Sequence, residues 1–170
     1  KAISNDVNPL SEILAKPRLF PPTITEIEDR LETIDFQTSA KPDIDLTMFY
    51  HPRTEIEILS LRNYFLEKSL STVLDHVDEW IRMVSTNRLT GHSNGFFSVY
   101  TLPPNQATRP ERQIKINEKL NQRPEYRDVK KIILEKSRSL LRDVTPEIRE
   151  RLNNDESNYL FTSQDAKDLS

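Results

Sequence analysis

The chain contains no cysteine among its 170 residues. This absence excludes disulfides, thiolate zinc sites and cysteine nucleophiles together. The sequence also lacks any run near the roughly 18 unbroken apolar residues that a membrane helix needs. No segment has the pattern of a signal or transit peptide. We therefore expect a cytoplasmic protein, with no membrane partner.

Glycine is almost as scarce, since only Gly91 and Gly95 occur. A dinucleotide-binding GxGxxG loop needs a third glycine, and a P-loop needs a wider spacing followed by lysine. Here Phe96 follows the second glycine. Neither phosphate-binding motif is therefore present in this chain.

Histidine occurs only at His51, His76 and His92. No pair of them has metal-ligand spacing, and no Gly-x-Ser-x-Gly motif marks an esterase-type serine. The sequence therefore predicts no metal site and offers no catalytic residue.

The net charge of −3 conceals a strong segregation. Residues 1–86 contain nine Lys/Arg and fifteen Asp/Glu, whereas residues 109–142 contain eleven Lys/Arg and five Asp/Glu. A basic block of this kind can bind nucleic-acid phosphates in a salt-sensitive way. The alternative is a solvated helix face on which Glu111, Glu118 and Glu135 alternate with the bases.

Between these blocks, residues 89–108 contain no Asp, Glu, Lys or Arg. This neutral stretch combines both glycines with three aromatic residues, a histidine and several Ser, Thr, Asn and Gln side chains. The mixture suits a flexible surface that stacks on bases and donates hydrogen bonds. The alternative is a buried hairpin with Phe96, Phe97, Val99 and Tyr100 in the core.

Apolar periodicity predicts a mostly helical chain that begins and ends on short strands, at residues 2–5 and 158–162. Thr23 and Glu26 have the spacing of a capping box. The predicted helices cover residues 9–16, 23–34, 52–84 (two helices that meet near 69–71), 110–120, 126–141 and 145–152. Their expected apolar faces include Ile27, Leu31, Ile58, Leu61, Phe65, Leu66, Val73, Val77, Trp80, Ile81, Val84, Ile114, Leu120, Val129, Ile132 and Ile133.

An acidic residue follows each predicted strand, at Asp6 and Asp165. A carboxylate just past the carboxyl end of a strand can bind a ribose hydroxyl or an adenine amine. Acidic residues in this position also commonly cap helices or turns.

Four stretches, residues 4–11 (SNDVNPLS), 87–106 (NRLTGHSNGFFSVYTLPPNQ), 113–142 and 163–169 (SQDAKDL), carry a resemblance that extends over nearly the whole chain. The sequence resembles the internal part of a bacterial DNA methyltransferase, of the kind that methylates an exocyclic amine of adenine or cytosine. Such enzymes bind S-adenosylmethionine on a Rossmann-like sheet and are found in restriction-modification systems.

The resemblance implies a cofactor-binding role for Asp6 and Asn8, in the Asp-x-Asn-Pro motif, and for Asp165 and Ala166 near the cofactor's adenine. It also implies that the helical insert recognises double-stranded DNA. The residues assigned to DNA are Arg88, His92, Asn94, Phe97, Tyr100, Asn105, Gln106, Arg123, Arg127, Lys130 and Lys131. Within that set, we expect Arg123, Arg127, Lys130 and Lys131 to face the DNA backbone.

The expected fold is mainly α with a small parallel β element, an α/β methyltransferase fragment. Residues 1–36 would form part of the cofactor domain, 37–155 the helical DNA-binding insert, and 156–170 the returning strand of the cofactor domain. The family's glycine-rich loop and its catalytic Asp/Asn/Ser-Pro-Pro-aromatic motif are not found, since Leu102-Pro-Pro-Asn105 has neither the acceptor residue nor the aromatic residue. The remainder of a methyltransferase polypeptide is therefore the expected partner. The alternative is a non-catalytic helical interaction module, or one that binds RNA.

Overall fold

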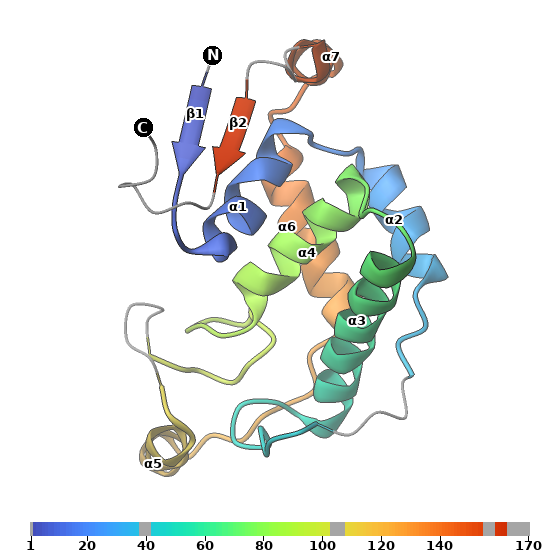
Figure 1. The fold of residues 1–170 in the computed structure, drawn as a ribbon. Helices are drawn as coiled ribbons and strands as arrows, with labels where there is room; N and C mark the ends of the chain where they lie inside the picture. Colours follow the sequence, from blue (N-terminus) through green and yellow to red (C-terminus); the bar gives the residue numbers. More distant parts are fainter. Residues whose placement is uncertain (1, 38–41, 103–107, 155–158, 163–170) are drawn as a thin grey trace.

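The computed structural model describes residues 2–37, 42–102, 108–154 and 159–162, and these are mainly helical (Figure 1). This confirms the expected class, a mainly α chain with a small parallel sheet. No helix among these residues is long and apolar enough to cross a bilayer. The elements are β1 (Ala2–Asn5), α1 (Pro9–Ala15), the 3₁₀ helix η1 (Lys16–Leu19), α2 (Ile24–Thr33), α3 (Pro52–Ser71), α4 (His76–Arg88), α5 (Pro110–Leu120), α6 (Val129–Leu141), α7 (Pro146–Asn154) and β2 (Tyr159–Thr162).

The two strands lie side by side and parallel, although more than 150 residues separate them in the chain (Figure 1). The register pairs Asn5 with Thr162. The side chain of Thr162 donates a hydrogen bond of 2.7 Å to the Asn5 amide oxygen. The pairing continues one residue further, where the Asp6 N–H donates to the Thr162 carbonyl at 3.1 Å. The parallel pairing expected from the sequence is therefore confirmed.

The first two α-helices begin at residues whose side chains cap them. The Asn8 side chain accepts a hydrogen bond of 3.0 Å from the Leu10 N–H at the start of α1. At α2, Thr23 and Glu26 each accept a hydrogen bond from the other's backbone N–H. These side chains bind first-turn N–H groups that have no partner within the helix. The predicted capping box is therefore confirmed.

Four helices, α2, α3, α4 and α6, share one hydrophobic core. Figure 1 shows α4 crossing α6 near the centre, with α2 and α3 beside them. Trp80 and Ile81 of α4 are buried, and the Trp80 indole N–H donates to the Ser137 hydroxyl of α6 at 3.0 Å. Ile27 and Leu31 of α2 belong to the same core. Residues on both sides of the predicted boundary at 36/37 therefore pack together.

Four apolar residues expected to line helix faces are exposed instead. Val73 is 90 % exposed, because it lies in the turn after α3 rather than on α4, and Leu66 is exposed near the end of α3. Ile114 and Leu120 of α5 are exposed as well, whereas Gln113 is fully buried. The assignments of Ile114 and Leu120 were wrong because α5 packs through polar contacts, which an apolar periodicity does not reveal.

Candidate functional site

The chain that leads into α6 is fixed to the start of α3 by buried polar side chains. The Thr54 hydroxyl donates to the Arg127 carbonyl at 2.9 Å and accepts from the Arg127 N–H at 2.8 Å. One carboxylate oxygen of Glu57 accepts from the Val129 N–H at 3.0 Å, and the other from the Tyr126 hydroxyl at 2.9 Å. These bonds explain why α6 begins at Val129 rather than at residue 126, and they orient Arg127.

The Arg127 side chain holds the turn at residues 93–96. Its Nη1 donates to the carbonyl oxygens of Ser93 and Phe96, both at 2.9 Å, and its Nη2 donates to the Asn94 side-chain oxygen at 3.2 Å. Burial lowers the pKa of Arg127, an effect that the charge of Glu125 opposes. A planar guanidinium can hold such a turn because its N–H donors, fixed in one plane, can bind several acceptors at once.

Phe96 is the last residue of the same turn, and its ring packs against two neighbouring side chains. The Arg88 guanidinium lies 4.1 Å from the centre of its ring, and the ring of His92 lies 6.1 Å away, centre to centre. A Cβ atom at Gly91 would lie 2.5 Å from three of the Phe96 ring atoms. Glycine is therefore required at position 91 for this packing. Burial lowers the pKa of Arg88.

The next part of the neutral stretch belongs to the core. Phe97 is only 1 % exposed, and Val99 is also buried. The Val99 N–H donates to the Phe49 carbonyl at 2.8 Å, and the Thr101 N–H donates to the Gly91 carbonyl at 3.0 Å. The stretch is therefore divided: Phe97 and Val99 are buried as that alternative expects, Phe96 is half-buried, and Tyr100 and residues 92–95 are exposed.

A cleft of about 700 Å³ lies between the turn and the segment that follows α5. Tyr100 is 41 % exposed on its wall. At its rim, Asn121 ends α5 in a left-handed conformation with φ of 46°, which asparagine adopts more readily than most residues. We call this hollow the loop cleft; it is lined by His92, Ser93, Asn94, Val99, Tyr100, Asn121, Gln122, Arg123, Glu125 and Arg127.

A network of side-chain amides fixes the backbone at Tyr100. Gln113 and Gln122 both donate to the Tyr100 carbonyl, at 2.9 and 3.0 Å. Both also donate to the Asn117 side-chain oxygen, and the Asn117 amide donates to the Met48 carbonyl at 2.8 Å. These amides were not predicted from the sequence, since no local pattern reveals partners so distant along the chain.

The loop cleft brings together five of the residues that the sequence assigns to DNA, namely His92, Asn94, Tyr100, Arg123 and Arg127. They come from two segments more than 20 residues apart in the sequence. Arg123 is exposed, whereas the Arg127 guanidinium is committed to the turn. Among the described residues that line it, the cleft therefore offers the cation of Arg123 beside exposed hydrogen-bonding groups.

The remaining members of that set lie elsewhere. Lys131 is exposed on the first turn of α6, and the Lys130 ammonium lies 4.7 Å from the centre of the Phe36 ring. Phe97 packs in the core and Arg88 stacks on the turn, so neither side chain is presented at the cleft. Asn105 and Gln106 lie outside the described residues.

The residues assigned to the cofactor are described only at the first strand. Asp6 is exposed directly after β1. Its carboxylate accepts hydrogen bonds from the Ser11 hydroxyl and the Asn8 N–H, which lower its pKa. Asn8 caps α1. Asp165 and Ala166 lie outside the described residues.

Within residues 2–37, 42–102, 108–154 and 159–162, no group of three acidic or histidine side chains could hold a metal ion. The chain matches no protein-family model, no curated protein and no solved structure. The geometry of its own residues is therefore what supports a function.

Proposed function

We propose that this chain is the target-recognition segment of an S-adenosylmethionine-dependent DNA methyltransferase, and that it binds double-stranded DNA at the loop cleft. The observation that supports this best is the turn at residues 93–96 and the exposed side chains of residues 92–95 around it. Its polar side chains are exposed, its backbone is held by Arg127, and the exposed cation of Arg123 lines the same cleft. Rigid presentation of this kind lowers the entropy cost of binding.

The exposed cations and the turn would make different kinds of contact with DNA. Arg123 and Lys131 are free to approach phosphates, which supplies affinity that does not depend on sequence. His92 and Asn94 carry hydrogen-bonding groups suited to base edges, and Tyr100 offers an aromatic surface on which an unstacked base can lie. Arg127 serves as a positioning residue rather than a phosphate contact.

The two parallel strands support the proposal that this segment belongs to a larger sheet, because a sheet of only two strands is marginally stable by itself. Asp6 fits a ribose contact, because each of its carboxylate oxygens retains a lone pair beyond the bonds it accepts from Ser11 and Asn8. Asp165 and Ala166 would contact the adenine. S-adenosylmethionine, when bound, supplies the methyl group that is transferred to the base.

The binding experiment is fluorescence anisotropy with labelled mixed-sequence duplexes between about 50 and about 200 mM salt. The double variant Arg123→Glu/Lys131→Glu, which reverses the exposed cation of the cleft and one on α6, should bind every duplex more weakly and flatten the salt slope by about one unit for each phosphate that is no longer neutralised. Arg142→Glu is the matched control, since Arg142 is exposed beyond the other end of the same helix. It should bind as the parent chain does.

Two outcomes would overturn the proposal. Absence of duplex binding at low salt would favour the alternative of a helical interaction module, which the burial of Phe97 and Val99 supports. Tighter binding to single-stranded RNA than to duplex DNA would assign the cleft to RNA. Methyl transfer is tested separately with labelled cofactor and mixed-sequence DNA, and these 170 residues alone should incorporate no methyl groups.

A further inference from the structure

A second hollow, of about 660 Å³, lies between α3 and α4. Most of its lining is apolar: α3 contributes Ile58, Leu61 and Phe65 among others, the segment before α3 contributes Ile44 and Leu46, and Leu89 and Phe97 reach it from beyond α4. Leu61 and Phe97 are core residues, so the hollow opens directly onto the core. We call it the α3–α4 groove.

Exposed apolar side chains continue this groove along α3. Leu66 lines it and is exposed, and Leu70, one turn further, is 90 % exposed. Val73, just past the end of the helix, is exposed to the same extent. Leu66 and Leu70 are four residues apart and therefore lie on one face of α3, so the apolar surface extends about one helical turn beyond the hollow. Exposed apolar side chains beside an apolar hollow are typical of an interaction site.

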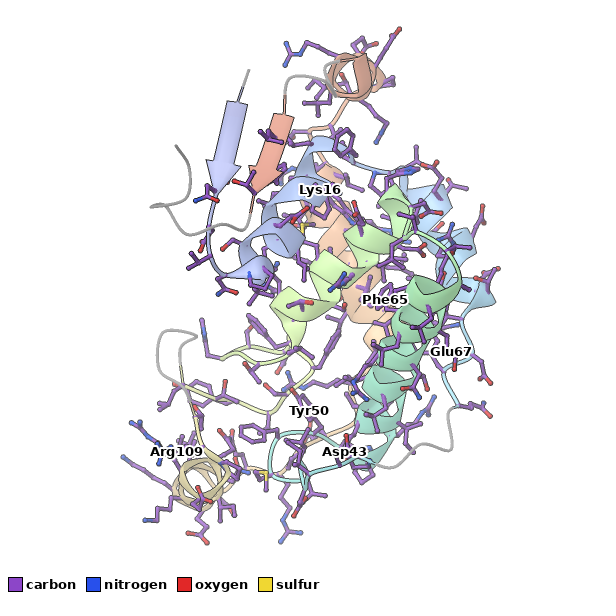
Figure 2. The ribbon with its side chains drawn as sticks, in the orientation of Figure 1. Lys16, Asp43, Tyr50, Phe65, Glu67 and Arg109 are labelled. Atoms are coloured by element: carbon purple, nitrogen blue, oxygen red, sulfur yellow. The ribbon has the colours of Figure 1, made fainter. Side chains whose placement is uncertain are left out.

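Unpaired positive charge accompanies the groove. Arg62 and Arg82 both line it, and among the described residues neither forms an ion pair with a carboxylate. Four other cations of the acidic first half, Lys16, Arg30, Arg53 and Lys68, do form ion pairs with carboxylates. The acidic residue that lines the groove, Asp43, lies toward the N-terminal end of α3, away from Phe65 (Figure 2).

We propose that the α3–α4 groove binds an amphipathic helix that carries carboxylates beside its apolar face. Apolar side chains at helical spacing would fill the hollow, and the carboxylates would pair with Arg62 and Arg82. A small amphiphile could fill the hollow, but it would leave Leu70 and Val73 uncovered. The length of the apolar surface therefore favours a helix. This inference does not depend on DNA binding.

The test uses the full 170-residue chain and labelled peptides of about 20 residues, long enough to form a helix. One peptide has leucines along one face and flanking glutamates, and its twin has lysines in place of the glutamates. In fluorescence anisotropy the glutamate peptide should bind about ten-fold more tightly than the lysine peptide at low salt. The double variant Arg62→Glu/Arg82→Glu should reverse that order.

The matched control is Arg18→Glu, because Arg18 also lacks a carboxylate partner among the described residues but lies outside the groove lining. It should leave both affinities unchanged. A milder pair, Arg62→Gln/Arg82→Gln, should remove the preference for glutamate, and circular dichroism checks that each variant is folded.

Equal affinity for the two peptides, or no binding of either, would overturn the proposal. Binding of decanoate without peptide binding would assign the groove to small apolar anions. Self-association abolished by Leu70→Asp would assign it to a second copy of the chain.

Discussion

Two clusters of charged side chains in this molecule are held by opposite means. Between α2, α3 and α4, the carboxylate of Asp78 is fully buried and forms ion pairs with Arg30 and Lys68, while the Tyr64 hydroxyl donates to it at 2.8 Å. At the turn of residues 93–96, the Arg127 guanidinium is bound by carbonyl oxygens, and no ion pair joins it to a carboxylate of the described residues.

The pKa shifts reflect this difference. Burial raises the pKa of Asp75, next to the buried aspartate, but hydrogen bonds from Arg30 and from the Asp78 N–H outweigh it and hold the pKa well below its usual range. At the turn, burial lowers the pKa of both Arg127 and Arg88. The first cluster cancels its own charge and fixes helix packing. The second keeps a net positive charge near the surface, where it can attract an anion.

The largest effect is expected from Asp78→Ala. It leaves Arg30 and Lys68 without their buried partner, and removing one member of a buried ion pair costs about 3–5 kcal/mol. Urea unfolding should show that loss in the free energy of unfolding. The control is Asp143→Ala, whose exposed ion pair with Arg142 should contribute less than about 1 kcal/mol. Equal losses in the two variants would refute the internal cancellation described for the first cluster.

At the turn, Gly91→Ala should destabilise the protein by about 1–3 kcal/mol, because its Cβ would overlap the Phe96 ring and push it off Arg88. Gly95→Ala is the control: there the nearest atom, Ser93 Oγ, lies 3.8 Å from the added Cβ. It should change stability by less than about 0.5 kcal/mol. Thermal unfolding of both variants provides the measurement, and similar midpoints would mean that Phe96 moves freely.

Local sequence signals predicted much of the fold. Thr23 and Glu26 identify the start of α2 because a capping box depends on residues only three apart. Pro110 similarly marks the first position of α5, as proline does at helix starts. The parallel pairing of residues 2–5 with 159–162 was predicted from the resemblance, not from periodicity, since no local signal joins segments so far apart.

The candidate site was predictable only as a set of residue types. Composition shows that residues 89–108 are unusual, but not that Phe97 turns inward while His92 stays exposed. The role of Arg127 depends on carbonyl groups more than 30 residues away. A basic residue in a basic block is easily assigned to phosphate, whereas its actual partners are neutral. Long-range polar contacts of this kind leave no periodic trace in the sequence.

If the proposed function is correct, Arg127→Lys separates positioning from phosphate contact. Lysine keeps the charge but cannot reach the Ser93 and Phe96 carbonyls and Asn94 together. Duplex affinity should fall about ten-fold, which corresponds to about 1.4 kcal/mol, with the salt slope unchanged. Arg123→Lys, at an exposed cation, should keep most of the affinity. Faster amide hydrogen exchange at the turn in Arg127→Lys would report the loosened turn even without DNA, and unchanged exchange would contradict it.

The smallest effect should come from Glu55→Gln, and its sign distinguishes an unsatisfied buried charge from a satisfied one. Glu55 and Glu57 lie on the same helix and are each 7 % exposed. Oε1 of Glu55 is buried with no hydrogen-bond partner among the described residues, whereas the Glu57 carboxylate accepts from the Val129 N–H and the Tyr126 hydroxyl. Burial raises the pKa of Glu55, and the charge of Asp45 adds to the effect.

A carboxyl whose pKa is raised by folding stabilises the protein while it is protonated, and that contribution is lost as the pH rises through its pKa. Glu55→Gln should therefore raise the free energy of unfolding at pH 7, by up to about 1 kcal/mol. The gain should vanish below about pH 3, well under the ordinary glutamate pKa, where Glu55 is protonated in the folded and unfolded states alike. Glu57→Gln should instead destabilise the protein by about 1–3 kcal/mol at pH 7, because one of its charge-assisted acceptors is removed. Urea unfolding of both variants at the two pH values measures the difference, and a loss of stability in Glu55→Gln at neutral pH would show that its carboxylate is satisfied after all.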